Sequence, residues 1–280
     1  MSLLKGTGAK VIEGIIKGVG YLSVLPVVCI VIYIIFKGVP SISWEFLATN
    51  PTDGMRAGGI LPAIIGSIYL TIGTIAVSVP FGILTGIFLV EYSKDNIIRR
   101  VINLTIVNLA GIPSIIYGLF GMSLFVIFLQ FGSSILSGAL TLGIMCLPVI
   151  ITATREALLA IPKDLREASL ALGATKWETT WKIILPTALP GILTGIILSI
   201  SRAAGETAPI MFTVAAFYLP FLPVSIWDQV MALPYHLYVI ATQVPNMPEN
   251  IMNGTVFVIV VLTVGFNLLG AFLRKKFSKK

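Results

Sequence analysis

Charged side chains are scarce in this 280-residue chain, where they make up 11% of the residues against 56% for hydrophobic ones. A soluble domain usually carries about 25% charged residues, so the composition excludes an ordinary water-soluble fold. Cysteine is scarce too, because Cys29 and Cys146 are the only two. Both fall inside long apolar runs, where we interpret them as small buried side chains and not as a disulfide framework.

The motifs of several enzyme classes are missing. No G-x-x-x-x-G-K-[ST] phosphate-binding loop occurs in the sequence, so the chain is not expected to bind ATP by that route. The sole histidine, His236, follows Tyr235 and has no carboxylate or metal-ligand spacing nearby. We therefore expect no catalytic, cofactor-binding or metal residues, and we expect His236 at a surface or membrane interface.

Long apolar runs, in contrast, are abundant. A helix needs roughly 20 mainly apolar residues to cross a bilayer, and six windows of about this length occur. The sequence therefore predicts an all-α membrane protein with about six transmembrane helices. The windows are 19–36, 64–90, 102–131, 135–152, 189–214 and 255–273.

The basic residues indicate the orientation of these helices. Of the 19 lysines and arginines, 16 lie before the first window, after the second, between the fourth and fifth, or after the sixth. Because positive charge gathers in cytoplasmic loops, both termini are predicted to be cytoplasmic. The basic excess then reflects topology in a lipid bilayer, and no nucleic-acid partner is expected. The stretch 215–254 contains five prolines and no lysine or arginine, and is predicted to be re-entrant or interfacial.

Glycine and proline interrupt several windows. Pro80, Gly82 and Gly86 are expected to interrupt the second, and the G-x-x-x-G spacing of the two glycines also permits close helix packing. The third window contains the stretch 111–118, with Gly111, Pro113 and Gly118. Two interpretations remain open for it: close packing, or a discontinuous helix along a solute path.

The stretch 155–186 between the fourth and fifth windows is the most specific feature. Pro162 and Asp164 favour the start of a short helix, and Gly173 is placed to end it. Thr175 and Glu178 form the pattern of a capping box that starts a second helix. The sequence predicts a cytoplasmic helix-turn-helix in which one face of the first helix carries Leu165, Ala168, Ser169 and Leu172.

This stretch resembles the EAA motif of bacterial and archaeal ABC importer permeases. The match comprises residues 167–169, then Gly173, Ile183 and Leu185-Pro186, with Ser169 where the motif has its second alanine. The resemblance implies that the loop docks on a separate ATPase subunit, which binds the ATP and Mg²⁺. The implied coupling residues are Glu167, Ala168, Ser169, Leu172 and Gly173.

Two charged residues lie inside the fifth window. Arg202 is near its middle, and Glu206 follows four residues later, where the two can pair on one helix face. Charges within the bilayer are costly and usually face a protein interior or a wet cavity. We interpret Arg202, Glu206 and Thr207 as part of a substrate pathway or gate, although an ion pair that only fixes helix packing is the alternative.

Residues 202–209 read R-x-x-G-E-T-A-P, and with the loop and the 111–118 stretch they resemble the PstA-type permease of phosphate ABC importers over about residues 59–272. The resemblance implies a type I importer permease fold with a MetI-like transmembrane domain, in a multi-pass protein of a bacterial or archaeal plasma membrane. The implied partners are a PstC-type permease, a PstB-type ATPase dimer and a PstS-type phosphate-binding protein. We expect a single transmembrane domain over 1–280, divided into 1–59, a permease core at 60–273 and a basic tail at 274–280.

Three other functions are considered. A related oxyanion importer for sulfate, molybdate or phosphonate remains open, since such importers share the EAA-like loop. Residues 263–266 resemble a potassium filter, but Asn267 stands where that filter needs a second glycine, which argues against a channel. The isolation of His236 argues against a membrane-embedded enzyme.

Overall fold

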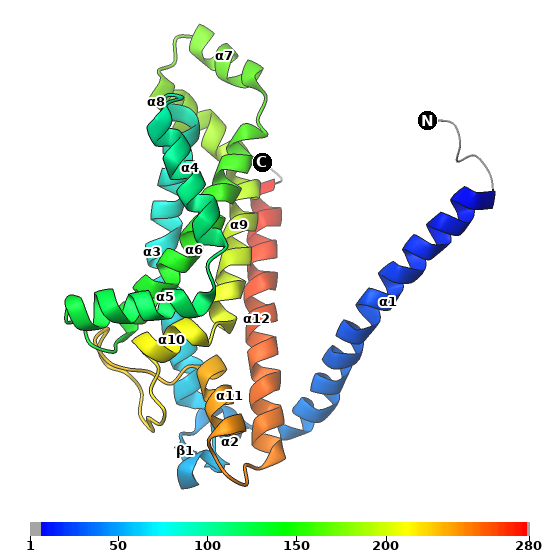
Figure 1. Cartoon of the computed structure of the whole chain (residues 1–280), viewed down its shortest axis with the longest axis vertical. Coiled ribbons are helices and arrows are strands. Elements are labelled where there is room, and N and C mark those ends of the chain that lie inside the picture. The colour runs from blue at the N-terminus through cyan, green and yellow to red at the C-terminus, as the bar shows by residue number, and fades with distance from the viewer. Residues whose placement is uncertain (1–6, 279–280) are drawn as a thin grey trace.

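The computed structural model describes residues 7–278 and consists mainly of helices that run between two ends of the molecule (Figure 1). Among these residues, five helices are long and apolar enough to cross a membrane, or six if one bent pair forms a single span. The prediction of about six spans is therefore confirmed. Lys5, Lys279 and Lys280, which the orientation prediction counts, lie outside the described residues. The five long helices are α1 (Thr7–Gly38), α3 (Leu61–Ile87), α6 (Ile135–Leu159), α9 (Leu185–Gly205) and α12 (Glu249–Ser278).

The third predicted window is not one straight helix. It divides into α4 (Ile97–Ala110) and α5 (Ser114–Gly121), which extends as a π-helical segment Met122–Phe128, and the two parts are bent by 106°. Pro113 lacks an amide donor and disfavours helical geometry in the residue before it, so the chain turns there. Of the two interpretations of residues 111–118, the structure shows the discontinuous helix. It also shows close packing, because a Cβ on Gly118 would lie 2.9 Å from Pro209 Cα.

The second window, in contrast, stays helical. Pro80 lies inside α3 without ending it, so the expected interruption is wrong. Gly82 and Gly86 face α6, where an added Cβ would lie 2.5 Å from Ile150 Cγ2 and 2.6 Å from Thr154 Cγ2, respectively. Because glycine has no side chain, Gly82 and Gly86 let α3 and α6 approach closely, as the G-x-x-x-G spacing predicts.

Small elements gather at one end of the molecule, which we call the α2 end (Figure 1). Strands β1 and β2 pair antiparallel with Pro51 opposite Gly58, a small departure from an all-α chain. Buried Phe46, Met55, Met231 and Leu233 share one apolar core there. The elements are the 3-10 turns Val39–Ser41 and Asp53–Met55, with α2 (Trp44–Ala48), β1 (Pro51–Thr52), β2 (Ala57–Gly58) and α11 (Leu233–Thr242).

Helix α1 stands apart from the bundle (Figure 1). None of its apolar window is buried, and its contact with α12 lies at its C-terminal end, where Gly38 faces Phe257. An apolar helix of this length is stable only against lipid or another apolar chain. The exposed face of α1 is therefore a membrane-facing or partner-facing surface.

Candidate functional site

The loop after α6 forms the helix-turn-helix that the sequence predicts, with α7 (Lys163–Ala171) followed by α8 (Lys176–Thr179). Asp164 lies in the first turn of α7, and Pro162 precedes that helix as its cap. Gly173 has φ +87°, a left-handed geometry that favours glycine. The capping box is present, since Glu178 N donates to Thr175 Oγ1 at 3.2 Å and Thr175 N donates to Glu178 Oε2 at 3.1 Å. Figure 1 shows this unit protruding at the end opposite α2, which we call the α7–α8 end.

The residues that the motif assigns to coupling divide into two groups. Leu172 is 89% exposed, and Glu167, Ala168 and Gly173 are exposed around it. Ser169 is 4% exposed, and its Oγ lies 2.8 Å from Thr179 Oγ1 on α8. The four exposed residues form a protruding surface, whereas Ser169 contacts α8 and holds α7 against it.

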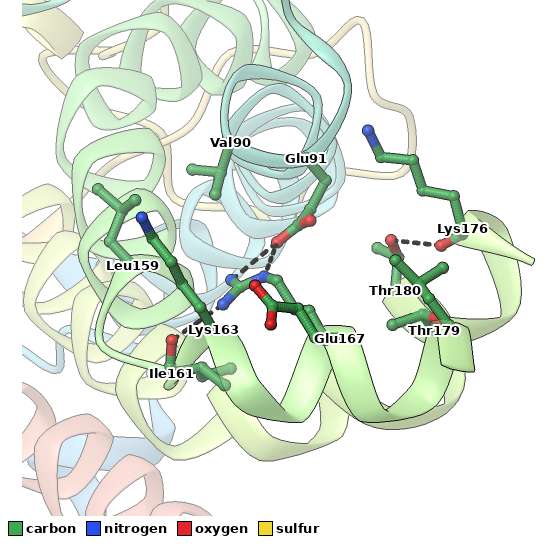
Figure 2. Close-up of a pocket in the computed structure, with 11 residues that line it drawn as sticks. Val90, Glu91, Leu159, Ile161, Lys163, Glu167, Lys176, Thr179 and Thr180 are labelled. Atoms are coloured by element: carbon green, nitrogen blue, oxygen red, sulfur yellow. Dashed lines mark hydrogen bonds and ion pairs between the residues drawn. The ribbon is translucent and has the colours of Figure 1, made fainter. Parts of the chain in front are cut away.

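A cavity of about 490 Å³ lies under α7 (Figure 2). Inside it the Arg166 guanidinium is bound to one carboxylate oxygen of Glu91, Oε1, through Nε at 3.1 Å and Nη2 at 2.9 Å. Glu91 belongs to a π-helical segment, Phe88–Tyr92, that continues α3. Sequence reasoning missed this pair because the partners are 75 residues apart. Other lining residues are Val90, Leu159, Ile161, Lys163, Glu167, Leu170, Lys176, Thr179 and Thr180.

Arg202 and Glu206 form the predicted ion pair, with Nε and Oε1 3.3 Å apart. The helical geometry is different from the prediction, because α9 ends at Gly205 and Glu206 is an extended cap residue. Arg202 therefore lies in the last turn of α9 and not in mid-helix, where its positive charge complements the negative end of the helix dipole. Thr207 precedes α10 (Ala208–Thr213) as its cap and makes no side-chain capping bond.

This ion pair is partly exposed. The Arg202 side chain is 46% exposed and that of Glu206 17%, and α9 ends part-way along α12 in Figure 1. A half-exposed arginine between the two ends of a membrane bundle is costly against lipid, so water or another protein chain has to cover it. Glu206 also lines a small cavity of about 10 Å³, roughly the room for one water. The cavity is shared with α3 residues Ser67, Leu70 and Thr71 and with Leu142, Ala203, Ala204, Ile210, Ala232 and Pro234.

Metal-binding and acid–base groups are not clustered at this site. Within residues 7–278, no group of three or more His, Cys, Asp or Glu side chains could hold a metal ion. His236 is 2% exposed, so the expected surface or interfacial position is wrong. Burial lowers the pKa of His236 to about 4, and neither ring nitrogen has a hydrogen-bond partner. Its ring is thus a neutral part of the core at the α2 end, packed there because α11 turns it inward.

Comparison with known families defines the class of protein. Residues 78–280 match the family model described as "Binding-protein-dependent transport system inner membrane component". The chain belongs to this family: it is a multi-pass plasma-membrane permease of an ABC importer. The permease of such an importer works with an ATPase and a substrate-binding protein, and is not itself the catalytic subunit.

Individual relatives narrow the class to a PstA-type permease of a type I ABC importer. The chain is 33% identical over 258 residues to the phosphate transport system permease protein PstA of Mycobacterium leprae, covering 90% of this chain and 84% of that one. It is 35% identical over 262 residues to the probable ABC transporter permease protein YqgI of Bacillus subtilis, covering 89% and 88%. A PstA of Haemophilus influenzae is 33% identical over 79% of each chain.

Solved structures agree on the fold. The inward-facing MetNI methionine ABC transporter superposes with a TM-score of 0.62 at 19% identity, covering 78% of this chain and 97% of that one. A bacterial ABC transporter that imports alginate superposes with a TM-score of 0.61 at 13% identity, covering 95% and 98%. The predicted MetI-like importer permease fold is therefore confirmed.

Proposed function

We propose that this chain is the PstA-type half of an ATP-driven phosphate importer. Similarity to proteins named PstA over most of the chain carries the proposal. The exposed Arg202 supports it, because a guanidinium offers several donors in a planar fork that suits an oxyanion. In this proposal Arg202, Glu206 and Thr207 line the anion path or its gate.

The proposed complex contains a PstC-type permease, two PstB-type ATPases and a PstS-type phosphate-binding protein. A second permease would cover both the bare face of α1 and the exposed side of Arg202. ATP and Mg²⁺ would bind to the ATPase subunits. The α7–α8 end and both termini would face the cytoplasm, as the distribution of basic residues favours.

Substrate-stimulated ATP hydrolysis tests the substrate. The complex is purified and its hydrolysis is measured with phosphate, sulfate, molybdate or phosphonate, each with its own binding protein. Phosphate with its binding protein should stimulate hydrolysis, and the other anions should not. Stimulation by sulfate, molybdate or phosphonate alone would instead assign the chain to a related oxyanion importer.

We further propose that the ATPase docks on Glu167, Ala168, Leu172 and Gly173, with Ser169 holding the docking helix to α8. The exposure of the first four supports this contact, since an exposed leucine beside small residues suits an apolar groove on a partner. A cysteine at Ala168 should cross-link to the ATPase in an active complex, with Cys29 first replaced by serine. Failure to cross-link at any stage of the ATP cycle would refute docking at this surface.

A further inference from the structure

The ion pair between Arg166 and Glu91 holds the proposed docking helix against the membrane bundle. Arg166 lies on α7, and its side chain is 20% exposed, while that of Glu91 is 9% exposed. Arg166 also donates from Nη1 to Ile161 O at 2.9 Å and from Nη2 to Leu158 O at 2.7 Å. One side chain thus bonds through Glu91 to the π-helical continuation of α3, to Leu158 O in the last turn of α6 and to Ile161 O just after that helix. A cation is favoured at this end of α6 by the helix dipole.

The other half of the α7–α8 unit reaches a different membrane helix. Thr179 on α8 is joined to Ser169 on α7 by their hydroxyl groups. From α8 the chain continues through the π-helical segment Thr180–Ile184 into α9, so that Lys176–Gly205 forms one span. A displacement of α7 therefore reaches α9 through the turn at Gly173, the Ser169–Thr179 contact and the continuous helix that starts at Lys176. It reaches the continuation of α3 through side chains, as in the Arg166–Glu91 pair.

Helices α3 and α9 both border the same small cavity. Ala203 and Ala204 of α9, and Ser67, Leu70 and Thr71 of α3, line the cavity that contains Glu206. About 20 residues of helix, or roughly 30 Å, separate that part of α3 from Glu91. The surroundings of Glu206 keep their shape only if the two helices move together.

We propose that the Arg166–Glu91 ion pair passes the displacement of α7 to α3, so that α3 and α9 move together around Glu206. This inference rests on the proposed docking of an ATPase at α7. Arg166 and Glu91 are positioning residues, because neither reaches the gate nor the exposed docking surface. Figure 2 shows the Glu91 carboxylate pointing toward α7, which carries Lys163 and Glu167. The cavity leaves space beneath α7, and the Arg166–Glu91 ion pair crosses that space to the π-helical continuation of α3.

The test measures phosphate moved per ATP hydrolysed in the full complex in proteoliposomes. Glu91→Gln and Arg166→Gln should each lower this ratio by about tenfold, the size of a typical coupling between sites, while assembly and hydrolysis persist. Lys182→Gln is the matched control, because it breaks an exposed ion pair with Glu178 on α8. The control should keep the wild-type ratio.

Two results would overturn the inference. The first is a wild-type ratio in both variants. The second is a proportional fall of hydrolysis and transport together with assembly, which is the behaviour of a structural brace. A wild-type complex whose hydrolysis does not respond to phosphate contradicts the proposed function, and the inference with it. That failure is distinct, because it occurs before any variant is made.

A covalent replacement tests the same link in a second way. Glu91→Cys with Arg166→Cys, in a chain with Cys29→Ser, removes the ion pair, and a short bis-maleimide then joins the two positions. The unlinked double variant should be uncoupled, and the cross-linker should restore at least about half of the lost ratio. A cross-linked complex that stays uncoupled, or an unlinked one that couples normally, would contradict the role of this pair.

Discussion

Substitution of Gly173 is expected to strain the turn between α7 and α8 without causing a steric clash. Its φ is +87°, and an added Cβ would meet no atom within 4 Å. The cost of Gly173→Ala is therefore backbone strain alone, about 1–2 kcal/mol for an L residue in left-handed geometry. Asparagine tolerates this geometry better, so Gly173→Asn should cost about half as much.

This strain acts on the turn that orients α7. Gly173 N donates to Leu170 O at 3.0 Å and Ala174 N donates to Ser169 O at 3.3 Å, which closes the end of the helix. If docking requires this turn, the strain weakens the binding of the ATPase to the permease by the same free energy. A cost of about 1–2 kcal/mol corresponds to about a 5- to 30-fold higher Kd for Gly173→Ala.

The assay titrates purified ATPase subunit onto the permease pair in nanodiscs. Gly132→Ala is the matched control, because Gly132 also has positive φ (+67°) and open space around its Cβ, yet lies outside α7 and α8. We expect the Kd to rise in the order Gly, Asn, Ala at position 173 and to stay unchanged for the control. Equal affinities along the series, or an equal loss in the control, would refute the assignment of this turn to docking.

Three further predictions concern other parts of the chain. Arg202→Gln should abolish phosphate uptake in an assembled complex, and added Glu206→Gln should not restore it; full recovery would mean that the pair is only a packing brace. The pKa of His236 is about 4 in the folded chain and about 6.5 when unfolded, so the unfolded state binds more protons between these values and the free energy of unfolding decreases as the pH is lowered, by up to about 3 kcal/mol. Thermal unfolding measured at about pH 7 and about pH 5 should show that His236→Leu loses less stability between the two pH values than the wild-type chain does. An equal loss of stability in both chains would contradict this. Gly86→Val should destabilise the chain by about 1–3 kcal/mol through contact with Thr154, whereas Gly265→Val, with no atom within 4 Å of its Cβ, should not; melting temperatures of the two variants decide this.

Local rules of sequence predicted much of the coupling loop. The helix stop at Gly173 and the capping box at Thr175 and Glu178 depend on neighbours within a few residues, and the structure has both. The apolar windows likewise gave the number of spans, because length and hydrophobicity decide whether a helix can cross a bilayer.

Features that depend on contacts between residues far apart in the sequence could not be predicted from the sequence. Arg166 and Glu91 meet only after α3, α6 and α7 have packed. The burial of His236 follows from the packing of α11, which the composition of 215–254 does not reveal. Hydropathy also does not mark a turn inside an apolar run, so the end of α9 at Gly205 was merged into a longer span. At residues 111–118, glycine and proline indicated a possible break in the helix, but the 106° bend depends on packing.

Uptake of labelled phosphate into proteoliposomes tests the central claim most directly. The vesicles contain this chain with its PstC-type partner and ATPase, and the phosphate-binding protein is added outside. We predict uptake that requires ATP, the binding protein and this chain together, and that excess sulfate does not reduce. Phosphate uptake that persists without this chain, or a complete complex that accumulates sulfate or molybdate in place of phosphate, would contradict the account.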